Sequence, residues 1–373
     1  MTLRLIFALL IACVAASLQL CAGFSQSPLY RADGRRAQNL QMGLRSRVAS
    51  IFRRGRVQRT DDELKGGIAK FYDESSSIWI DVWGEDMHHG YYKDKGQKDH
   101  KAAQVAMIDN SLAWAYQGDF KPAMQRMKAF VDVGCGVGGS SRHIARTYGS
   151  SDVTGEGLSL SPYQIQRAQE FTQAAGLQEK LTYRVADAMK MPFADNSFDL
   201  AWSMESGEHM PDKRDFLREL LRVTAPGGRV LVVTWCHREL AQGETTLTDK
   251  ELRLLDKINR AYYLPDWVPV SDYVKLGAEM GLEDVRQEDW SEFVAPFWPA
   301  VIRSALVPRN FLRMMRTGGT TIKGAVASLW MQRGFRKGVV KFVLFTGRKP
   351  LAPATEPAPA VEANVDDASN ILQ

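Results

Sequence analysis

The glycine-rich segment Val131–Gly139 contains the residues whose types and spacing point most directly to chemistry. It follows a short apolar run and precedes a helical pattern, so a strand-to-helix turn is expected there. Four of six consecutive positions are glycine, namely Gly134, Gly136, Gly138 and Gly139. A bare turn needs one or two glycines, whereas this number lets the backbone approach a bound cofactor closely.

Two kinds of cofactor are compatible with this loop. Gly134, Gly136 and Gly139 match the dinucleotide-binding pattern, and Glu156 follows about 20 residues later, where a ribose contact is expected. Alternatively, the loop lets the backbone approach the methionine and ribose portions of S-adenosylmethionine. Asp132 favours the second cofactor, because a carboxylate suits an ammonium and a sulfonium and suits phosphates poorly.

Short apolar strands alternate with helical segments around this loop. The expected strands are Ala129–Val133, Val153–Leu158, Leu181–Ala186, Phe198–Ser203, Arg229–Trp235, Asp284–Trp290 and Val339–Thr346. The expected helices between them are Ser140–Tyr148, Pro162–Gly176, Lys213–Val223, 248–262 and 271–280. This alternation predicts βαβ units and a parallel sheet whose strand C-termini form one site edge. A mostly helical region, 61–128, precedes the sheet.

Three further segments indicate which cofactor binds. Asp187 closes the third strand, where its carboxylate can accept the adenine amino hydrogens. Met191–Leu200 leads into the fourth strand and Ala225–Val230 turns into the fifth. In this order and spacing the chain resembles the class I S-adenosylmethionine-dependent methyltransferases.

That resemblance implies an α/β, Rossmann-like fold. It implies a seven-stranded, mostly parallel sheet with helices on both faces, an N-terminal helical cap over 61–128, and a methyltransferase domain over 129–349. A C-terminal lid is expected to be inserted at about 291–337. The implied cofactor contacts are Asp132, Gly134, Cys135, Gly136, Gly138, Ser159, Asp187, Ala188 and Ser203. The family places an acid where this chain has Ser159, so the ribose contact lies between Ser159 and Glu156.

The resemblance narrows in the second half of the chain. Its motifs are Trp202–Lys213, Val233–Arg238, Trp290–Ala300 and Lys341-Phe342. These are similar to the γ-tocopherol C-methyltransferases of plastids over about 61–349. The similarity implies methyl transfer to a ring carbon of γ- or δ-tocopherol, giving α- or β-tocopherol in vitamin E biosynthesis. Another prenylquinol, a sterol or an amine stays open as the acceptor. An NAD(P)-dependent oxidoreductase and a non-catalytic scaffold are the alternatives from other classes.

Ring methylation needs a base, because a phenol has a pKa of about 10 and its ring carbon becomes nucleophilic as the proton leaves. His209 and His237 follow strand ends on the site edge, and an imidazole suits this role. Glu205 and Glu208 are expected to orient the hydroxyl or to stabilise developing positive charge. The alternatives are that Glu208 and His209 only cap a helix and that His237 only packs a strand end. No spacing of His and Cys indicates a metal site.

The aromatic segment Trp79–Tyr92 is expected to close over the cofactor. Its composition, rich in Trp, His, Gly and Tyr, is unlike that of plain surface. The family resemblance adds Tyr72, Trp83 and His89 as candidates in this lid.

The chain's net charge of +5 is unevenly distributed along the sequence. Residues 1–60 carry ten Arg and one acid, and the body, 61–349, is neutral, which argues against a nucleic-acid binder. Within the body, 293–349 holds eleven Lys and Arg and no acid, together with many apolar residues. This composition predicts peripheral contact with an anionic membrane, where a prenyl-tailed substrate resides. The alternative is a pair of helices that covers the core.

The two ends of the chain are expected to lie outside the folded body. Residues 1–23 have the pattern of a signal peptide and 24–60 that of a transit peptide, together typical of plastid targeting in algae with secondary plastids. Simple secretion is the alternative. Only Cys135 and Cys236 remain after the leader, so a disulfide framework is excluded. The Pro- and Ala-rich segment 350–373 is expected to be a disordered tail. Oligomeric state is left undetermined.

Overall fold

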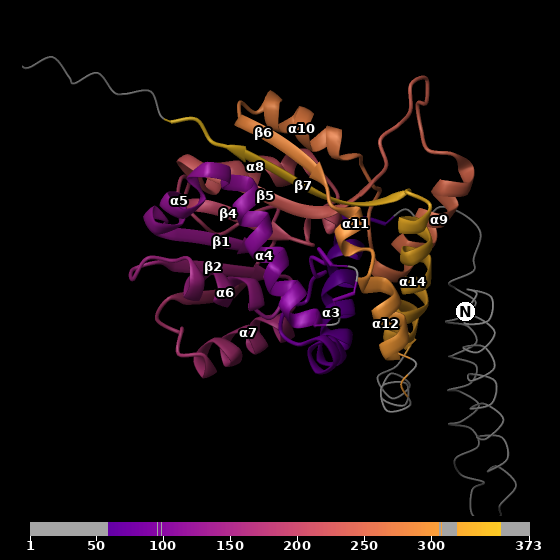
Figure 1. Cartoon of the computed structure of the whole chain (residues 1–373), viewed down its shortest axis with the longest axis horizontal. Coiled ribbons are helices and arrows are strands. Elements are labelled where there is room, and N and C mark those ends of the chain that lie inside the picture. The colour runs from indigo at the N-terminus through magenta and orange to yellow at the C-terminus, as the bar shows by residue number, and fades with distance from the viewer. Residues whose placement is uncertain (1–58, 95, 98, 306, 308–318, 352–373) are drawn as a thin grey trace, which may run out of the picture.

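A seven-stranded sheet organises the computed structural model, which describes residues 59–94, 96–97, 99–305, 307 and 319–351 (Figure 1). Its strands are β1 (Ala129–Val133), β2 (Thr154–Ser159), β3 (Leu181–Val185), β4 (Phe198–Met204), β5 (Thr224–His237), β6 (Glu283–Asp289) and β7 (Val340–Arg348). The order is β3-β2-β1-β4-β5-β7-β6, and β7 runs antiparallel to both of its neighbours. The predicted class I methyltransferase architecture is confirmed. The predicted leader and tail lie outside the described residues.

Helices cover both faces of this sheet. Because successive side chains of a strand point to opposite faces, each face has its own hydrophobic core. The helices of the sheet domain are α6 (Gly139–Thr147), α7 (Pro162–Ala174), α8 (Lys213–Val223), α9 (Asp249–Tyr262) and α10 (Val270–Glu279). On β5, Leu231 and Val233 belong to the core beneath α6 and α7, while Val230 and Val232 belong to the core beneath α8 and α10. The predicted helical boundaries agree with these to within a few residues.

Strand β5 begins earlier than its sequence suggests, at Thr224 rather than at Arg229. Thr224 pairs with Phe198, and the register then shifts so that Arg229 pairs with Leu200. The intervening Pro-Gly-Gly segment bulges out of the ladder, with Gly227 at a φ of 78°. A segment with the composition of a turn is therefore contained within a longer strand.

Before the sheet comes a helical cap. It consists of α3 (Asp61–Trp83), α4 (His100–Tyr116), η3 (Gln117–Asp119) and α5 (Phe120–Arg126). A capping box starts α3: the Thr60 hydroxyl accepts from the Glu63 amide at 3.3 Å, and the Glu63 carboxylate accepts from the Thr60 amide at 2.9 Å. The helix ends at Gly84, whose φ is 90°. Its buried apolar stripe comprises Leu64, Ile68 and Phe71.

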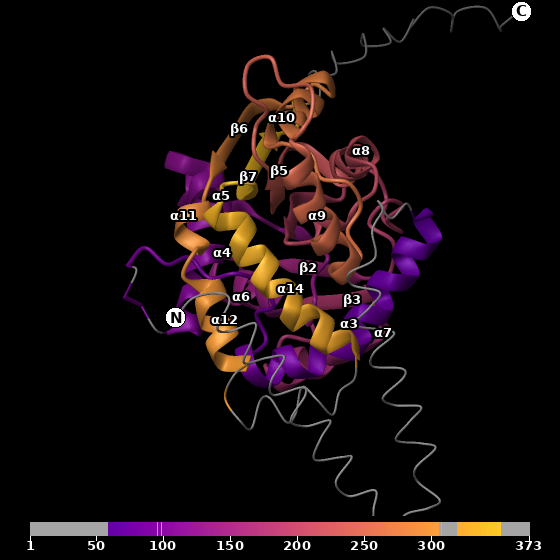
Figure 2. The same cartoon turned by 90° about the vertical axis from the view of Figure 1, so that its right-hand side faces the viewer.

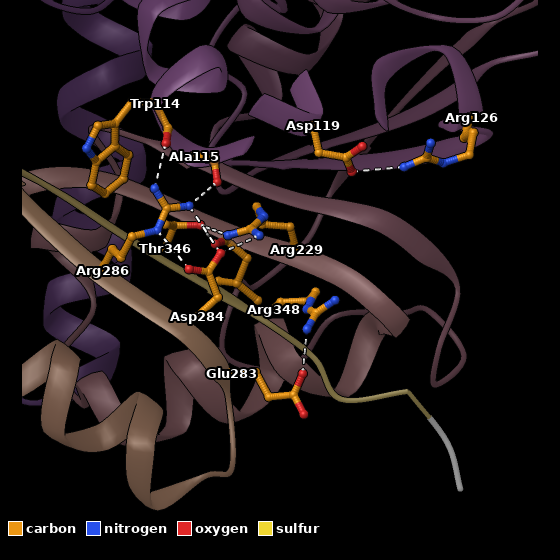
Figure 3. A network of polar contacts seen from close by, with 11 residues as sticks. Trp114, Ala115, Asp119, Arg126, Arg229, Glu283, Asp284, Arg286, Thr346 and Arg348 are labelled. Carbon is orange, nitrogen blue, oxygen red and sulfur yellow. Dashed lines mark hydrogen bonds and ion pairs between the residues drawn. The ribbon is translucent and has the colours of Figure 1, made fainter. Parts of the chain in front are cut away.

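A network of polar contacts ties this cap to the far edge of the sheet (Figure 3). Arg286 on β6 donates to the carbonyls of Trp114 and Ala115, at 2.9 and 2.6 Å, in the last turn of α4. Asp284 accepts from Arg286 at 3.0 Å and from Arg229 at 2.8 Å. One guanidinium thereby satisfies two carbonyls at the helix end and neutralises a carboxylate.

The predicted lid region lies between β6 and β7 and forms α11 (Ser291–Val294), α12 (Phe297–Ala305) and α14 (Gly319–Arg336). Figure 2 shows α14 crossing in front of the sheet, with α9 and α12 beside it. Side chains from α3, α9, α12 and α14 share a third core cluster. None of the described helices combines the length and the apolar character needed to cross a membrane.

Candidate active site

A cavity of about 1030 Å³, open to solvent, lies at the C-terminal ends of the parallel strands. The ends of β1 to β4 contribute residues that the sequence singled out. They are Asp132, Gly134, Cys135 and Gly136 at the end of β1, Ser159 as the last residue of β2, Asp187 and Ala188 after β3, and Glu205 and His209 after β4. Helix α3 forms the opposite wall with one face, through Asp61, Leu64, Lys65, Ile68 and Tyr72.

The glycine loop needs its glycines for conformation and for close contacts. Gly134, Gly136 and Gly138 have φ values of 85°, 54° and 78°, in the left-handed region. A Cβ on Gly134 would lie 2.6 Å from the hydroxyl oxygen of Ser206. A side chain at Gly139 would collide with the segment that follows α3, since its Cβ would lie 2.6 Å from the Glu85 carbonyl oxygen.

Asp132 lies at the base of the loop and is 2% exposed. Its carboxylate accepts from the Ser141 hydroxyl at 2.5 Å. Burial raises the pKa of Asp132 to about 6, against which the Ser141 hydrogen bonds and the nearby Arg142 act. The group is therefore mostly ionised at neutral pH and presents a negative charge to a cationic ligand.

The ribose alternatives separate in the structure. Ser159 lines the cavity, and its hydroxyl donates to Gln164 at 2.7 Å. Glu156 does not line it and instead forms an ion pair with Arg184 at 2.8 Å. The geometry favours Ser159.

Beyond the end of β3, Asp187 accepts from the Met189 amide at 2.9 Å and pairs with Lys65 of α3 at 2.7 Å. Two of the expected cofactor residues support the cavity without lining it. Gly138 starts α6, and the Ser203 hydroxyl bonds that of Ser206 at 2.7 Å. A carboxylate near the glycine backbone, a hydroxyl and a second carboxylate fit the methionine, ribose and adenine portions of S-adenosylmethionine in turn.

A second cavity, of about 720 Å³ and also open to solvent, adjoins the first and is mainly aromatic. Its rings are Phe71, Tyr72, Trp79, Trp235, Tyr262, Phe297 and Trp298. Five residues line both cavities, namely Tyr72, Met87, His88, Glu205 and His209. We refer to these five as the junction, because a group passing between ligands in the two cavities would cross there.

Glu205 occupies the junction with a φ of 50°, an unusual backbone conformation for a non-glycine residue. Its carboxylate accepts from the backbone amide of His89 at 2.5 Å and from the Nδ1 of His89 at 2.7 Å. Burial would raise the pKa of Glu205, but the charge and hydrogen bonds of His89 bring that pKa below its usual value. Glu205 is thus an ionised carboxylate in a fixed pair.

Glu208 lines the aromatic cavity and, unlike the ionised Glu205, is mostly protonated at neutral pH. Burial, followed by the charge of Glu205, raises the pKa of Glu208 to about 8. The Thr234 hydroxyl donates to it at 2.8 Å, and the buried Lys213 holds its turn by donating to the carbonyl of Gly207 at 2.8 Å. Two neighbouring carboxyls with separated pKa values are a common arrangement in acid–base sites.

His209 is held as a neutral ring. Its Nε2 lies 3.0 Å from the hydroxyl of Tyr72, which projects from α3. Burial, and then the charge of Lys213, lowers the pKa of His209 to about 3. His237, in contrast, lines neither cavity, and its Nδ1 donates to the carbonyl of Arg238 at 2.6 Å. We leave His237 out of the catalytic set.

Unpaired polar atoms concentrate around the aromatic cavity. Within the described part of the chain, nine buried side-chain nitrogen or oxygen atoms have no hydrogen-bond partner. Six of them belong to residues of this cavity: His88, His89, Gln104, His209, Trp235 and Trp298. Buried polar groups are normally satisfied, so this concentration favours a ligand that carries polar groups, and the aromatic walls favour an apolar or aromatic body.

The segment that follows α3 is the part that the sequence described least well. The expectation that Trp79–Tyr92 covers the cofactor agrees with Glu85, Met87 and His88 lining the first cavity. The Trp83 side chain lies outside the described residues. Sequence reasoning missed Gln104, and the only signal for it was its place on the buried face of α4.

Two further expectations concern metals and thiols. Among the described residues, no group of three or more His, Cys, Asp or Glu side chains is arranged to hold a metal. Cys135 and Cys236 are both free and buried.

Comparisons with known proteins give consistent results. Residues 131–232 match the family model described as a methyltransferase domain. The chain is 52% identical over 291 residues to a protein of Oryza sativa subsp. japonica named "Probable tocopherol O-methyltransferase, chloroplastic", covering 77% of this chain and 79% of that protein. It is 48% identical over 298 residues to the "Tocopherol O-methyltransferase, chloroplastic" of Arabidopsis thaliana, covering 78% and 84% respectively.

Solved structures support the same fold. A putative sarcosine dimethylglycine methyltransferase from Galdieria sulphuraria matches with a TM-score of 0.62 at 24% identity, covering 74% of this chain and 99% of that one.

Proposed function

The chain belongs to the tocopherol methyltransferase family of S-adenosylmethionine-dependent enzymes, and from that premise we propose that it methylates the chromanol ring carbon of γ- and δ-tocopherol. The observation that carries this proposal is the aromatic cavity with six unpaired polar atoms, which shares the junction with the cofactor cavity. A chromanol is an aromatic body with one hydroxyl, and it matches both properties of the cavity.

S-adenosylmethionine is the cofactor, and when bound it supplies a methyl group made electrophilic by a sulfonium. Asp132 and the backbone around Gly134 and Gly136 would hold its methionine portion, Ser159 its ribose, and Asp187 with Ala188 its adenine. The junction residue Met87, from the segment over the glycine loop, helps to exclude water.

In the aromatic cavity the protein's residues orient the acceptor and handle its protons. The Tyr72–His209 pair and the Glu205–His89 pair are fixed dipoles on either side of the junction, and we assign them to placing the hydroxyl and the ring. Glu208 has a pKa of about 8, and in its ionised form it is the group best suited to take the proton that leaves the methylated ring carbon.

The decisive experiment separates carbon from oxygen as the methyl acceptor, since the two relatives are named O-methyltransferases. γ-Tocopherol carrying deuterium at the vacant ring position next to the hydroxyl is incubated with the enzyme and S-adenosylmethionine. Carbon methylation releases the deuterium and leaves a free hydroxyl, whereas oxygen methylation retains the deuterium and removes the hydroxyl. Retained deuterium would refute the ring-carbon assignment.

Parallel reactions with methyl-phytyl-benzoquinol and a sterol test the acceptor class. Turnover of either, with none of γ- or δ-tocopherol, would refute the tocopherol assignment. S-adenosylhomocysteine is expected to raise the melting temperature and NADPH to leave it unchanged, which separates a methyltransferase from an oxidoreductase.

We also propose that the enzyme contacts a membrane through the basic segment 293–349. Arg333, Arg336 and Lys337 are exposed at the end of α14. The apolar residues Phe297 and Trp298 are buried, so the support for this proposal is charge rather than an exposed apolar face. Phe311, Leu312, Met314 and Met315 fall outside the described residues.

Vesicle binding tests the membrane proposal. Arg333→Glu with Lys337→Glu is expected to reduce sedimentation with anionic vesicles, while activity on detergent-solubilised tocopherol is retained. Lys121→Glu with Lys128→Glu makes the same charge change at other exposed lysines and is the matched control. Equal vesicle binding by the test variant and the control would refute this membrane face.

We place the protein in the plastid, because the names of the two plant relatives describe them as chloroplastic. The leader expected over 1–60 is tested by fusing it to a fluorescent protein in an alga with secondary plastids. Plastid fluorescence with 1–60, and cytosolic fluorescence after deletion of 1–23, is the expected result. Export of the full fusion from the cell would favour simple secretion.

A further inference from the structure

His88 is the junction residue with a defined ring tautomer and an unused nitrogen. The residue is 7% exposed, and its Nδ1 lies 2.9 Å from the backbone carbonyl oxygen of His89. A carbonyl only accepts, so Nδ1 carries the proton. In the neutral ring, Nε2 then holds a free lone pair, and it is one of the buried atoms without a partner among the described residues.

The backbone that carries His88 is held from the helical cap. Gln104 of α4 is 1% exposed, and its amide nitrogen donates to the carbonyl of His88 at 3.0 Å and to that of Asp86. One side chain thereby clamps the segment on either side of Met87. A ring fixed by its own Nδ1 hydrogen bond, on a clamped backbone, is pre-organised to present Nε2 in one direction.

The other imidazoles of the aromatic cavity are less suited to accept a proton. Burial and the charge of Lys213 lower the pKa of His209 to about 3, and its Nε2 already faces the Tyr72 hydroxyl. His89 uses Nδ1 on Glu205, and five aromatic rings lie within 6.4 Å of its ring, centroid to centroid. His88 and His209 both line the two cavities and both have an unpartnered ring nitrogen, but only for His88 does the partner of the other nitrogen, a carbonyl, define the unpartnered one as proton-free.

Resting on the proposed function, we propose that Nε2 of His88 is the general base that removes the proton from the acceptor hydroxyl. The O–H bond breaks, its electron pair stays on oxygen and enriches the ring, and the proton forms a new N–H bond on Nε2. After the new ring carbon–methyl bond forms, the ring C–H electrons return to the ring as its proton passes to the ionised carboxylate of Glu208, which then releases it to water. His88 then returns its proton to the oxygen, so each turnover releases one proton in total.

The test variant is His88→Asn, because the asparagine amide can replace the Nδ1 donor to the His89 carbonyl while nothing replaces Nε2. At pH 7 we expect kcat on γ-tocopherol to fall by about 10²-fold or more, with the KM for tocopherol and the Kd for S-adenosylhomocysteine nearly unchanged. The deficit should shrink as the pH approaches about 10, the ordinary pKa of a phenol, because the acceptor then ionises without a base.

Other titrating groups face the same two cavities, and they are present in both the native enzyme and His88→Asn. The ratio of the native kcat to the variant kcat at each pH therefore isolates the contribution of His88. They are Tyr72 from α3, Glu85, Asp86 and His89 from the same segment, Glu205, Glu208 and His209 after β4, and Tyr262 from α9.

His237→Asn is the matched control. His237 also donates from Nδ1 to the next residue's carbonyl, but it lines neither cavity, so its replacement should leave kcat within about twofold. A kcat for His88→Asn close to that of the native enzyme, a deficit that does not change with pH, or an equal loss in His237→Asn would overturn the assignment. Absence of tocopherol turnover by the native enzyme would instead refute the proposed function, so the two failures are distinguishable.

Discussion

Replacing Glu208 by Gln should stabilise the protein while inactivating it. Burial and the charge of Glu205 raise the pKa of Glu208 from 4.5 to about 8 in the folded protein. The unfolded chain releases this proton above its ordinary pKa while the folded protein retains it, so the stability of the native protein falls as pH rises through that interval. Glutamine has no proton to release and can still accept the Thr234 hydrogen bond.

The magnitude follows from about 1.4 kcal/mol for each pH unit of separation. The variant's advantage in the free energy of unfolding should be under about 1 kcal/mol at pH 5, about 3 kcal/mol at pH 7 and close to 5 kcal/mol at pH 9. At pH 7 this corresponds to a rise of about 6 °C in Tm. Activity should fall by about 10²-fold or more, because the ring proton loses its acceptor.

Urea unfolding followed by tryptophan fluorescence, without cofactor, measures this difference at pH 5, 7 and 9. Glu179→Gln, at an exposed position, controls for the loss of a carboxylate and should show no such pH trend. If the difference between Glu208→Gln and the native protein is the same at pH 5 and pH 9, then Glu208 does not retain its proton and our reasoning about the buried carboxyl pair is wrong.

Three other predictions concern the cofactor site and the cap. Affinity for S-adenosylhomocysteine, measured by calorimetry, should fall about tenfold between pH 7 and pH 5, because Asp132 has a pKa of about 6 and loses its charge. In Asp132→Asn the affinity should be weaker than in the native protein and independent of pH. Gly139→Ala should weaken the same affinity at least about tenfold, since its Cβ would lie 2.6 Å from the Glu85 carbonyl oxygen; native-like affinity would show that the segment yields easily. Arg286→Met should lower the free energy of unfolding by about 2 kcal/mol, as two helix carbonyls lose their partner and Asp284 keeps only Arg229; an unchanged urea midpoint would refute the role of the network in Figure 3.

The convergence of the candidate cofactor residues on one cavity was predictable because they sit at strand ends. Parallel strands bring their C-terminal ends to one edge, so Asp132, Ser159 and Asp187 converge wherever the βαβ pattern holds. The start of β5 was not predictable from composition. Its Pro-Gly-Gly segment has the residues of a turn, and only pairing with β4 reveals a bulge.

The acceptor side depended on packing that periodicity does not specify. Tyr72 and His209 are 137 positions apart and meet because α3 lies across the sheet edge. Gln104 lies on the buried, apolar face of α4. Its amide finds two carbonyls to donate to only because of the path that the segment before α4 takes. The charge states of Glu205 and Glu208 likewise follow from which partners are buried beside each.

The two cavities draw on different stretches of the chain. Among the described residues, the lining of the cofactor cavity ends at Pro211, whereas the aromatic cavity adds Trp235, Tyr262, Phe297 and Trp298. Substitutions from β5 onward can therefore remodel the acceptor site while the methyl-donor machinery stays intact. Such a division allows related enzymes to acquire new acceptors through substitutions in the C-terminal part of the chain alone. It also makes a chimera joined after Pro211 a rational starting point for enzymes with new acceptors.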